Sequence, residues 1–270
     1  MQTILLMTDF SDNAKNAIQY AIEMHGEEVN YVLLNTYVVR ENVGAFMSVA
    51  NKIKEITEKE LYAEVNFIRK KYPRFSRLNI TTFAKRGDPI DGVNTLKDQY
   101  PVDLIVMGTK GASGLTKLLI GSVTSSIVKN TSLPVLIVPE RAKYQGIKKI
   151  VFAVDEFKFD DELLNPLNTI IQKENAVLHL LNVVTEEGEE IGVDQLKQLE
   201  DESTVVASVI GENVSEEVER YATKNNIDLI TVVSHHNKFF DRLLHKSVSQ
   251  ELVFHAKLPI LALDDSYISD

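Results

Sequence analysis

Residues 102–126 read VDLIVMGTKGASGLTKLLIGSVTSS. The stretch opens with a short apolar run, passes through a glycine-rich loop and ends in a segment rich in Ser and Thr. Four of the chain's 12 glycines lie between Gly108 and Gly121. Glycine lets backbone N–H groups approach a ligand closely, and the start of a helix favours anions. The stretch therefore predicts a strand, a phosphate-binding loop and a helix, in that order.

Side chains in the same stretch also suit an anionic ligand. Ser122 and Thr124 offer hydroxyl donors at the helix start, and Lys110 and Lys117 add positive charge to the loop. The alternative interpretation is a plain connector between strand and helix with ordinary caps. That would account for one or two glycines, but not for glycines at both ends of a long loop before such a helix start. We therefore expect a phosphate cradle here.

Outward from this stretch, the chain repeats itself. Five segments of the first half return in the same order in the second. They are 4–9 and 150–155, 32–36 and 179–183, 102–106 and 227–231, 117–123 and 242–248, and 133–138 and 258–263. The offset falls from 146–147 residues to 125 along the chain, so the first copy is the longer one. We interpret this as a tandem duplication into domains 1–145 and 146–270.

Each copy alternates short apolar runs with helical patterns, which predicts βαβ units and a parallel sheet. The first helix is expected to start after a Ser11 cap and to end near Gly26. In the first copy we expect strands at 3–8, 29–36, 78–84, 103–107 and 134–138, and further helices within 44–71, 88–100 and 121–131. The second copy follows suit, with an acidic helix around 189–202. The predicted fold class is α/β: two tandem doubly wound domains, each with a five-stranded parallel sheet.

Composition narrows the class of protein further. Of the 270 residues, 44% are apolar and 25% are charged, as in soluble globular chains. The absence of cysteine excludes disulfides, cysteine-ligated metal centres and thiol chemistry. No apolar run approaches the roughly 18–20 residues of a membrane-spanning helix, and the first residues lack the basic region of a signal peptide. We expect no membrane partner and a cytoplasmic location.

The two halves of the chain differ in net charge. The net charge is −10, with 18 basic against 15 acidic residues in 1–146 and 11 against 24 in 147–270. Neutralising nucleic-acid phosphates needs a basic face, so no nucleic-acid partner is expected. The basic run 69–77 is interpreted as a solvated helix end. A small anionic ligand would favour the N-terminal half.

The common nucleotide and nucleophile motifs are missing. The chain has no G-x-x-x-x-G-K-[ST] of a P-loop and no G-x-G-x-x-G after the first strand of either copy. It also lacks the G-x-S-x-G nucleophile elbow. The glycine loop therefore has to be interpreted by its own spacing.

By that spacing, the chain resembles the universal stress protein family over essentially its whole length, as a tandem pair. ATP-binding members of the family carry G-x2-G-x9-G-[S/T], and Gly108, Gly111 and Gly121-Ser122 fit it. Other landmarks in common are Asp9 closing the first strand, Gly-Asp-Pro at 87–89 and Leu-Pro-Val at 133–135. The resemblance implies a Rossmann-like fold of the adenine nucleotide alpha hydrolase type, and ATP as ligand, with or without Mg²⁺.

The resemblance also implies a place for each part of the nucleotide. Asp9 would contact the base or ribose region, and the backbone of Thr36 would meet adenine. The remaining implied site residues are Met107 and Gly108 beside the ribose, and Gly111, Gly121, Ser122, Val123 and Thr124 around the phosphates. No catalytic residue and no metal ligand is assigned. Met7 is a departure, because the family often has proline two residues before the strand-one aspartate, and it changes the shape of the adenine side.

The second copy lacks the cradle. The positions of the four loop glycines are taken by Val233, His236, Phe239 and Lys246. A β-carbon at each should block close backbone approach, so we expect the N-terminal domain alone to hold nucleotide. The second copy keeps a strand-one acid, Asp155, and a loop hydroxyl, Ser247. Its loop histidines match no zinc-site spacing that we tested, and surface histidines are the simpler interpretation.

Three functions remain open. The first is a regulatory stress-response module that binds ATP, with the second domain as its structural partner. In relatives the last strands pair across a dimer, so 134–138 and 259–263 would here form an intrachain pseudo-dimer and protect two sheet edges. Two chains could still associate as a homodimer.

The second open function is a slow ATPase or phosphoryl-transfer enzyme, which needs a Mg²⁺-binding carboxylate and a group that positions water. The third is a duplicated scaffold without ligand.

Overall fold

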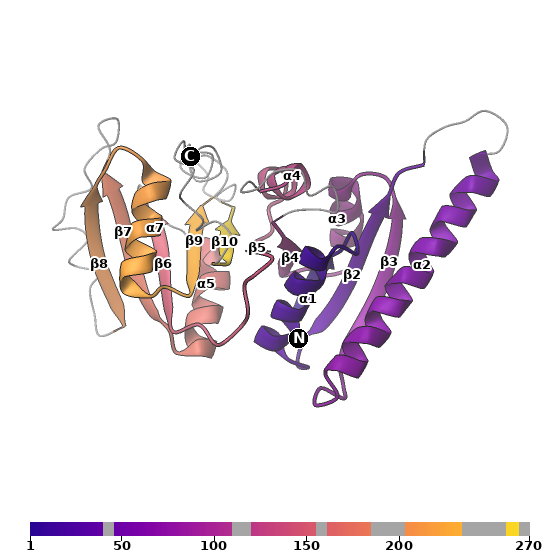
Figure 1. Cartoon of the computed structure of the whole chain (residues 1–270), viewed down its shortest axis with the longest axis horizontal. Coiled ribbons are helices and arrows are strands. Elements are labelled where there is room, and N and C mark those ends of the chain that lie inside the picture. The colour runs from indigo at the N-terminus through magenta and orange to yellow at the C-terminus, as the bar shows by residue number, and fades with distance from the viewer. Residues whose placement is uncertain (40–45, 110–119, 155–160, 185–202, 234–257, 265–270) are drawn as a thin grey trace.

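The computed structural model describes residues 1–39, 46–109, 120–154, 161–184, 203–233 and 258–264. Strands and helices alternate through both halves, which lie side by side with β5 and β10 between them (Figure 1). The first half contains β1 (Thr3–Met7), α1 (Asp12–His25), β2 (Asn30–Tyr37), α2 (Phe46–Lys71), β3 (Asn79–Arg86), α3 (Pro89–Lys97), β4 (Leu104–Gly108), α4 (Ser122–Asn130) and β5 (Val135–Val138). The second contains β6 (Lys149–Val154), α5 (Asp161–Glu174), β7 (Val177–Val184), β8 (Thr204–Ile210), α7 (Val214–Asn225), β9 (Leu229–Val233) and β10 (Ile260–Leu263).

All these strands form one ten-stranded sheet in the order β3-β2-β1-β4-β5-β10-β9-β6-β7-β8. Within each half the neighbours are parallel, as in a doubly wound domain. The halves meet where β5 and β10 pair antiparallel, with Leu136 opposite Leu261. These strands lie in the two segments for which the sequence predicted a pairing. The predicted α/β class is confirmed, and the helix expected at 189–202 lies outside the described residues.

Helices cover both faces of the sheet. In β1, Ile4 and Leu6 join a core cluster with residues of α1, α2 and α5, whereas Leu5 and Met7 join a second cluster with residues of α3, α4 and α7. Strand side chains alternate between faces, and a sheet covered on both faces buries every position. This is why β1 is buried throughout and is apolar from Ile4 to Met7 instead of alternating with polar residues.

Short polar contacts fix the ends of these elements. Ser11 caps α1, because its Oγ accepts a hydrogen bond from the Ala14 N–H at 3.2 Å, and α1 ends at Gly26, where φ is 73°. Asp103 accepts from the Thr3 N–H at 2.7 Å, and Asp228 accepts from the Lys149 N–H at 3.0 Å in the second copy. Both aspartates therefore fasten the start of a neighbouring strand.

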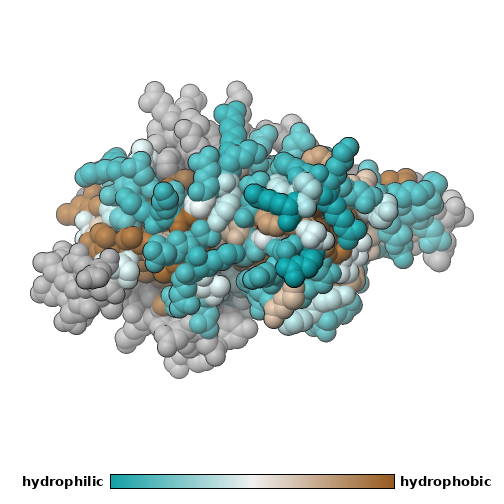
Figure 2. All heavy atoms as spheres, turned by 90° about the horizontal axis from the view of Figure 1, so that it is seen from below, coloured by the Kyte–Doolittle hydropathy of each residue, from teal (hydrophilic) through white to brown (hydrophobic). Residues whose placement is uncertain are grey.

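The surface is mainly hydrophilic on the face seen from below, where hydrophobic residues show only in small areas (Figure 2). In the described part of the chain, no helix is long and apolar enough to span a membrane. The exposed apolar side chains include Tyr62 and Phe67 on α2, and Phe67 lines a cavity between α1 and α2.

Candidate functional site

A cavity of about 190 Å³ lies at the carboxyl ends of β1, β2 and β4, where the first turns of α3 and α4 also meet. It is lined by Met7, Thr8, Asp9, Ala14, Leu34, Thr36, Pro89, Met107, Gly108, Val123 and Thr124. Six of the nine site residues expected from the sequence lie together in it: Asp9, Thr36, Met107, Gly108, Val123 and Thr124. Open α/β sheets bind ligands at this edge. The volume is below the roughly 300–1,000 Å³ of complete small-molecule sites, so these residues enclose only part of a nucleotide-sized ligand.

The turn after β1 presents Asp9 at the rim of this cavity. Asn35 on β2 donates from Nδ2 to the Thr8 carbonyl at 2.8 Å and so fixes the end of β1. The Phe10 N–H donates to Thr8 Oγ1 at 3.0 Å, and Phe10 adopts a φ of 65°, which is rare for a residue with a side chain. The Ser11 N–H then donates to Asp9 Oδ1 at 3.1 Å. The turn thus holds an exposed carboxylate in a fixed place.

The end of β4 packs against α1 instead of leaving its glycine open to a ligand. A β-carbon on Gly108 would lie 2.7 Å from Cγ and Oδ1 of Asn13. Asn13 is itself held there, since its Nδ2 donates to the Val138 carbonyl at 3.2 Å and its Oδ1 accepts from Thr109 Oγ1 at 3.2 Å. The sequence interpretation of Gly108 as a site of close ligand approach is therefore incomplete, because the packing of Asn13 alone requires glycine.

Thr124 connects the start of α4 to the end of β4. Its hydroxyl donates to the Gly108 carbonyl at 2.9 Å, and the residue is buried. The hydroxyl thus fastens α4 to the end of β4, and a contact between Thr124 and a phosphate stays a prediction. Ser122, by contrast, is exposed at the first position of α4.

The start of α4 is held close to the end of β4. Gly121 is the N-cap residue and supplies no side-chain hydrogen bond to the first turn. Its own N–H donates to the Thr109 carbonyl at 2.6 Å, which brings the helix start back to the end of β4. N–H groups of a first turn lack helical partners and attract negative charge. Gly111, Lys110 and Lys117 lie outside the described residues.

The start of α3 forms another part of the wall of the cavity of about 190 Å³. Asp88 caps this helix by accepting from the Ile90 and Asp91 N–H groups at 2.8 and 3.0 Å. Pro89 lines the cavity, and Gly87 before it has a φ of 131°, which explains the Gly-Asp-Pro sequence as a turn followed by a capped helix. Sequence reasoning noticed these residues without including Pro89 among the site residues. The apolar lining from Ala14 and Leu34 was also missed, because it depends on which buried positions reach the sheet edge.

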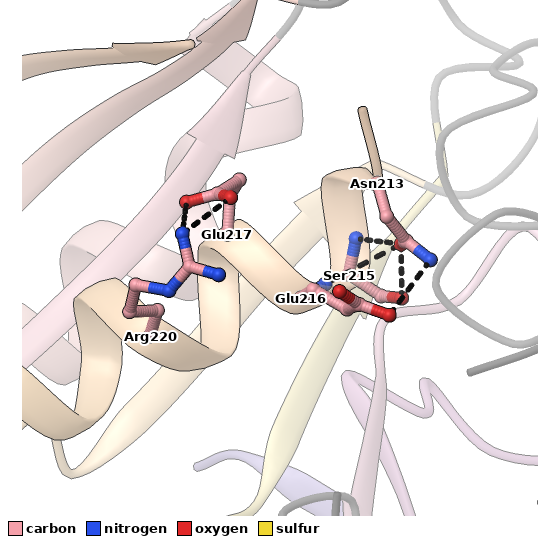
Figure 3. Close-up of polar contacts among 5 residues, drawn as sticks. All are labelled: Asn213, Ser215, Glu216, Glu217 and Arg220. Atoms are coloured by element: carbon pink, nitrogen blue, oxygen red, sulfur yellow. Dashed lines mark hydrogen bonds and ion pairs between the residues drawn. The ribbon is translucent and has the colours of Figure 1, made fainter. Parts of the chain in front are cut away.

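The second domain repeats the scaffold of the site. Asn182 donates to the Val154 carbonyl at 3.3 Å, as Asn35 does to Thr8. Asn213 caps α7 as Asp88 caps α3, since its Oδ1 accepts from the Ser215 N–H at 3.0 Å and the Glu216 N–H at 3.4 Å (Figure 3).

The residues at the equivalent positions of the second domain nevertheless differ in chemical type. Four residues after the cap, Gly92 of α3 packs against Thr36, whereas α7 has Glu217 at the corresponding place. Glu217 forms an ion pair with Arg220 at 2.6 Å (Figure 3). Among the described residues, no group of His, Asp and Glu side chains could hold a metal ion. Asp155, Ser247 and the loop histidines lie outside the described part of the chain, so nucleotide binding by the N-terminal domain alone stays a prediction.

Known proteins resemble both halves. A family model described as the universal stress protein family matches residues 1–139 and again 146–264. A universal stress protein of Methanocaldococcus jannaschii is 30% identical over 145 residues, which are 52% of this chain and 83% of that protein. A universal stress protein of Mycobacterium tuberculosis is 24% identical over 139 residues, covering 51% of this chain and 95% of its own length.

The crystal structure of a universal stress protein from Archaeoglobus fulgidus resembles the whole chain. It superposes with a TM-score of 0.67 at 17% identity and covers 97% of this chain and 98% of its own. A crystal structure from Pseudomonas aeruginosa, of a protein assigned to the same class, gives a TM-score of 0.56 at 13% identity over 98% of this chain and 93% of its own. At these identities the likeness concerns the fold, and it extends through both domains.

Proposed function

This chain belongs to the universal stress protein family as a tandem pair of its domains, and we propose that it is a regulatory module whose N-terminal domain binds ATP. The observation that carries the proposal is the cavity at the carboxyl edge of β1, β2 and β4, in which Asp9, Thr36, Met107 and Gly108 meet the start of α4. The loop spacing of Gly108, Gly111 and Gly121-Ser122 supports the same ligand.

The residues present fit the parts of an adenine nucleotide. Met7, Leu34 and Met107 give the cavity an apolar lining that suits a purine ring. The exposed Asp9 carboxylate can accept hydrogen bonds from an amino group or a ribose hydroxyl. The start of α4, with Gly121 as its N-cap, suits phosphate oxygens. A Mg²⁺ ion, if bound, would accompany the phosphates, because no metal-binding group occurs among the described residues.

In this proposal the second domain is a structural partner. The antiparallel pairing of β5 with β10 covers two strand edges within one chain, so no second chain is needed to protect them. Binding by the N-terminal domain alone is supported by the glycine-free loop of the second copy and by its 24 acidic against 11 basic residues. A cytoplasmic location belongs to the same proposal and agrees with a chain that has no cysteine.

Binding without rapid hydrolysis fits the described lining better than catalysis does. Phosphoryl transfer needs a metal-binding carboxylate and a group that orients the attacking water near the γ-phosphate. Of the described residues that line the cavity, Asp9 is the one carboxylate, and it lies at the end that we assign to adenine and ribose. We therefore propose that occupancy of the site, rather than turnover, is the regulated property.

The test is to denature freshly purified protein and to identify the released nucleotide by mass spectrometry, with its stoichiometry per chain. We expect about one ATP per chain, because one intact cradle is proposed. Two nucleotides per chain would overturn binding by the N-terminal domain alone. If none is released and a titration with ATP also shows no binding, the ligand-free scaffold is correct.

A matched pair of variants assigns the site. Asp9→Asn should weaken ATP binding, whereas Asp155→Asn, the same change at the equivalent position of the second copy, should leave it unaltered. Gly121→Val adds a side chain at a backbone conformation that any residue adopts, with φ −64° and ψ 156°, and should block the phosphates without unfolding the domain. Unchanged affinity in both Asp9→Asn and Gly121→Val would refute the site.

A further inference from the structure

A second and larger cavity, of about 730 Å³, lies between α1 and α2. Its volume falls within the roughly 300–1,000 Å³ of small-molecule sites. Two side-chain hydrogen bonds join α1 to the end of α2: Lys71 donates to Gln19, and the Tyr72 hydroxyl donates to Glu23 Oε1 at 2.9 Å. Phe10 lies at the cavity next to Asp9 in sequence, and Glu140 and Lys143, from the segment that follows β5, complete the lining.

The cavity is lined by one stripe of each helix, which is polar on α1 and mixed on α2. On α1 the lining residues are Asp12, Lys15, Asn16 and Gln19, and on α2 they are Glu60, Ala63, Glu64 and Phe67. Each set has the spacing i, i+3, i+4, i+7, which is one face of a helix. Helices that pack together normally interdigitate apolar ridges. Here the apolar stripe of α2, with Leu61, Val65 and Ile68, belongs to the core instead, so the facing stripes remain available to a ligand.

Charge in the cavity is negative. Four carboxylates, from Asp12, Glu60, Glu64 and Glu140, stand against the two ammonium groups of Lys15 and Lys143. Lys143 donates to Asn16 Oδ1 at 2.6 Å. Within the described part of the chain, Asp12, Glu60 and Glu140 form no ion pair. An occupant that brings positive charge would therefore be attracted to carboxylates on three separate walls: α1, α2 and the segment after β5.

The buried carboxyl group of Glu64 also favours an occupant that carries positive charge. The residue is only 7% exposed although it lines the cavity. Burial raises the pKa of its carboxyl group, and the Asp9 charge acts in the same direction, while Lys15 and a hydrogen bond with Thr8 oppose the rise. A buried carboxylate is stabilised by a nearby cation, so an ammonium group placed in the cavity would favour the ionised form of Glu64.

Two rings determine what kind of cation suits the cavity. Phe10 and Phe67 both line it, and Phe67 remains 50% exposed. Aromatic faces attract ammonium groups and pack against methylene chains. The described carboxylates do not converge on a metal-binding group, and their positions on different walls call for several charges joined by an apolar chain. We propose that the cavity between α1 and α2 binds a linear polyamine, with its ammonium groups at the carboxylates and its methylene chain against Phe10 and Phe67.

The absence of tryptophan from the chain permits a direct test. Phe67→Trp places a single fluorescent indole in the cavity, and Tyr62→Trp places one on α2 at a side chain that is 66% exposed and does not line the cavity. The full chain would be titrated with spermidine at constant ionic strength, because exposed charges are screened by salt. We expect a saturable change in emission for Phe67→Trp and none for Tyr62→Trp.

Carboxylate variants in the Phe67→Trp chain then identify the partners. Glu60→Gln and Glu140→Gln should each raise the half-saturating spermidine concentration roughly two- to fivefold, as for other exposed charge pairs. Glu58→Gln is the matched control, because Glu58 lies on α2 and pairs with Lys54 at 3.6 Å without lining the cavity. Butylamine, with one ammonium group, should bind more weakly than spermidine.

Three results would overturn the proposal. They are a lack of saturation with Phe67→Trp, an equal response from Tyr62→Trp, and a loss of affinity in Glu58→Gln as large as in Glu60→Gln. None depends on ATP binding, because the readout reports the cavity between α1 and α2 in protein without added nucleotide. The polyamine site and the proposed nucleotide site can therefore fail separately.

Discussion

Leu136 and Leu261 face each other across the antiparallel junction of β5 and β10, and both are fully buried. They belong to the core cluster that also contains Leu6 of the first domain and Phe152 of the second. The junction is therefore part of a continuous core and not a contact between two separately covered sheets. Stability of either domain should depend on residues of the other.

Leu261→Ala should lower the free energy of unfolding by about 2–5 kcal/mol, because it removes buried methyl groups and leaves a cavity. Amide hydrogen exchange measures the result in each domain. We expect faster exchange in β4 and β5 as well as in β9 and β10. Val205→Ala, at a partly exposed position of edge strand β8, is the control and should change exchange little. Faster exchange confined to the second domain would contradict a shared core.

Gly108→Ala should destabilise the first domain by about 1–3 kcal/mol, the usual cost of overpacking. The new methyl group would lie 2.7 Å from the Asn13 side chain. The same change in an Asn13→Ala background should cost less, since the obstructing amide is gone. Urea denaturation of the two single variants and the double variant measures this coupling. Simple additivity would show that Asn13 is not the reason for glycine at position 108.

His25 should make the protein sensitive to acid. The residue is buried at the end of α1, and burial, with a smaller contribution from Lys173, lowers its pKa from 6.5 to about 3. Below pH 6.5 the unfolded chain takes up a proton that the folded chain does not, so stability falls as the pH falls from 6.5 toward 3. The expected slope from this residue is up to about 1.4 kcal/mol per pH unit. His25→Gln should remove that part of the slope in denaturation curves measured from pH 7 to pH 5.

Glu219 should act in the opposite direction in the second domain. Burial, with the neighbouring Glu216 charge, raises its pKa from 4.5 to about 7. The folded chain holds this proton more tightly than the unfolded chain, so the contribution is fully present below pH 4.5 and is lost as the pH rises through 7. Glu219→Gln should therefore raise the thermal unfolding midpoint at pH 8 and leave it almost unchanged at pH 4. Glu212→Gln, an exposed control, should show no such difference between the two pH values.

The order and type of the described elements could be predicted from the sequence because each depends on local pattern. The Ser11 cap and the Gly26 end lie next to the helix that they delimit. The predicted strand 103–107 is shifted by one residue in the structure, to Leu104–Gly108.

The parts of the site that sequence reasoning missed depend on contacts between distant residues. Gly108 meets Asn13 from 95 positions earlier, and no local spacing reveals that contact. The hydroxyl of Thr124 turns to the Gly108 carbonyl for the same kind of reason. The cavity between α1 and α2 was also not foreseen. Each lining stripe, taken alone, is typical of a helix face in solvent, and only the fold places the two opposite each other.

The single sheet has an evolutionary consequence for the duplicated halves. Once β10 completes the edge of β5, the second copy is retained for its strand edge even if it contributes no ligand chemistry. Selection on that copy would then act on pairing and core positions such as Leu261, while the loop positions that correspond to the glycines of the first copy would be free to change. A gene duplication of this kind converts a symmetric pair into an unequal one, in which each half constrains the sequence of the other.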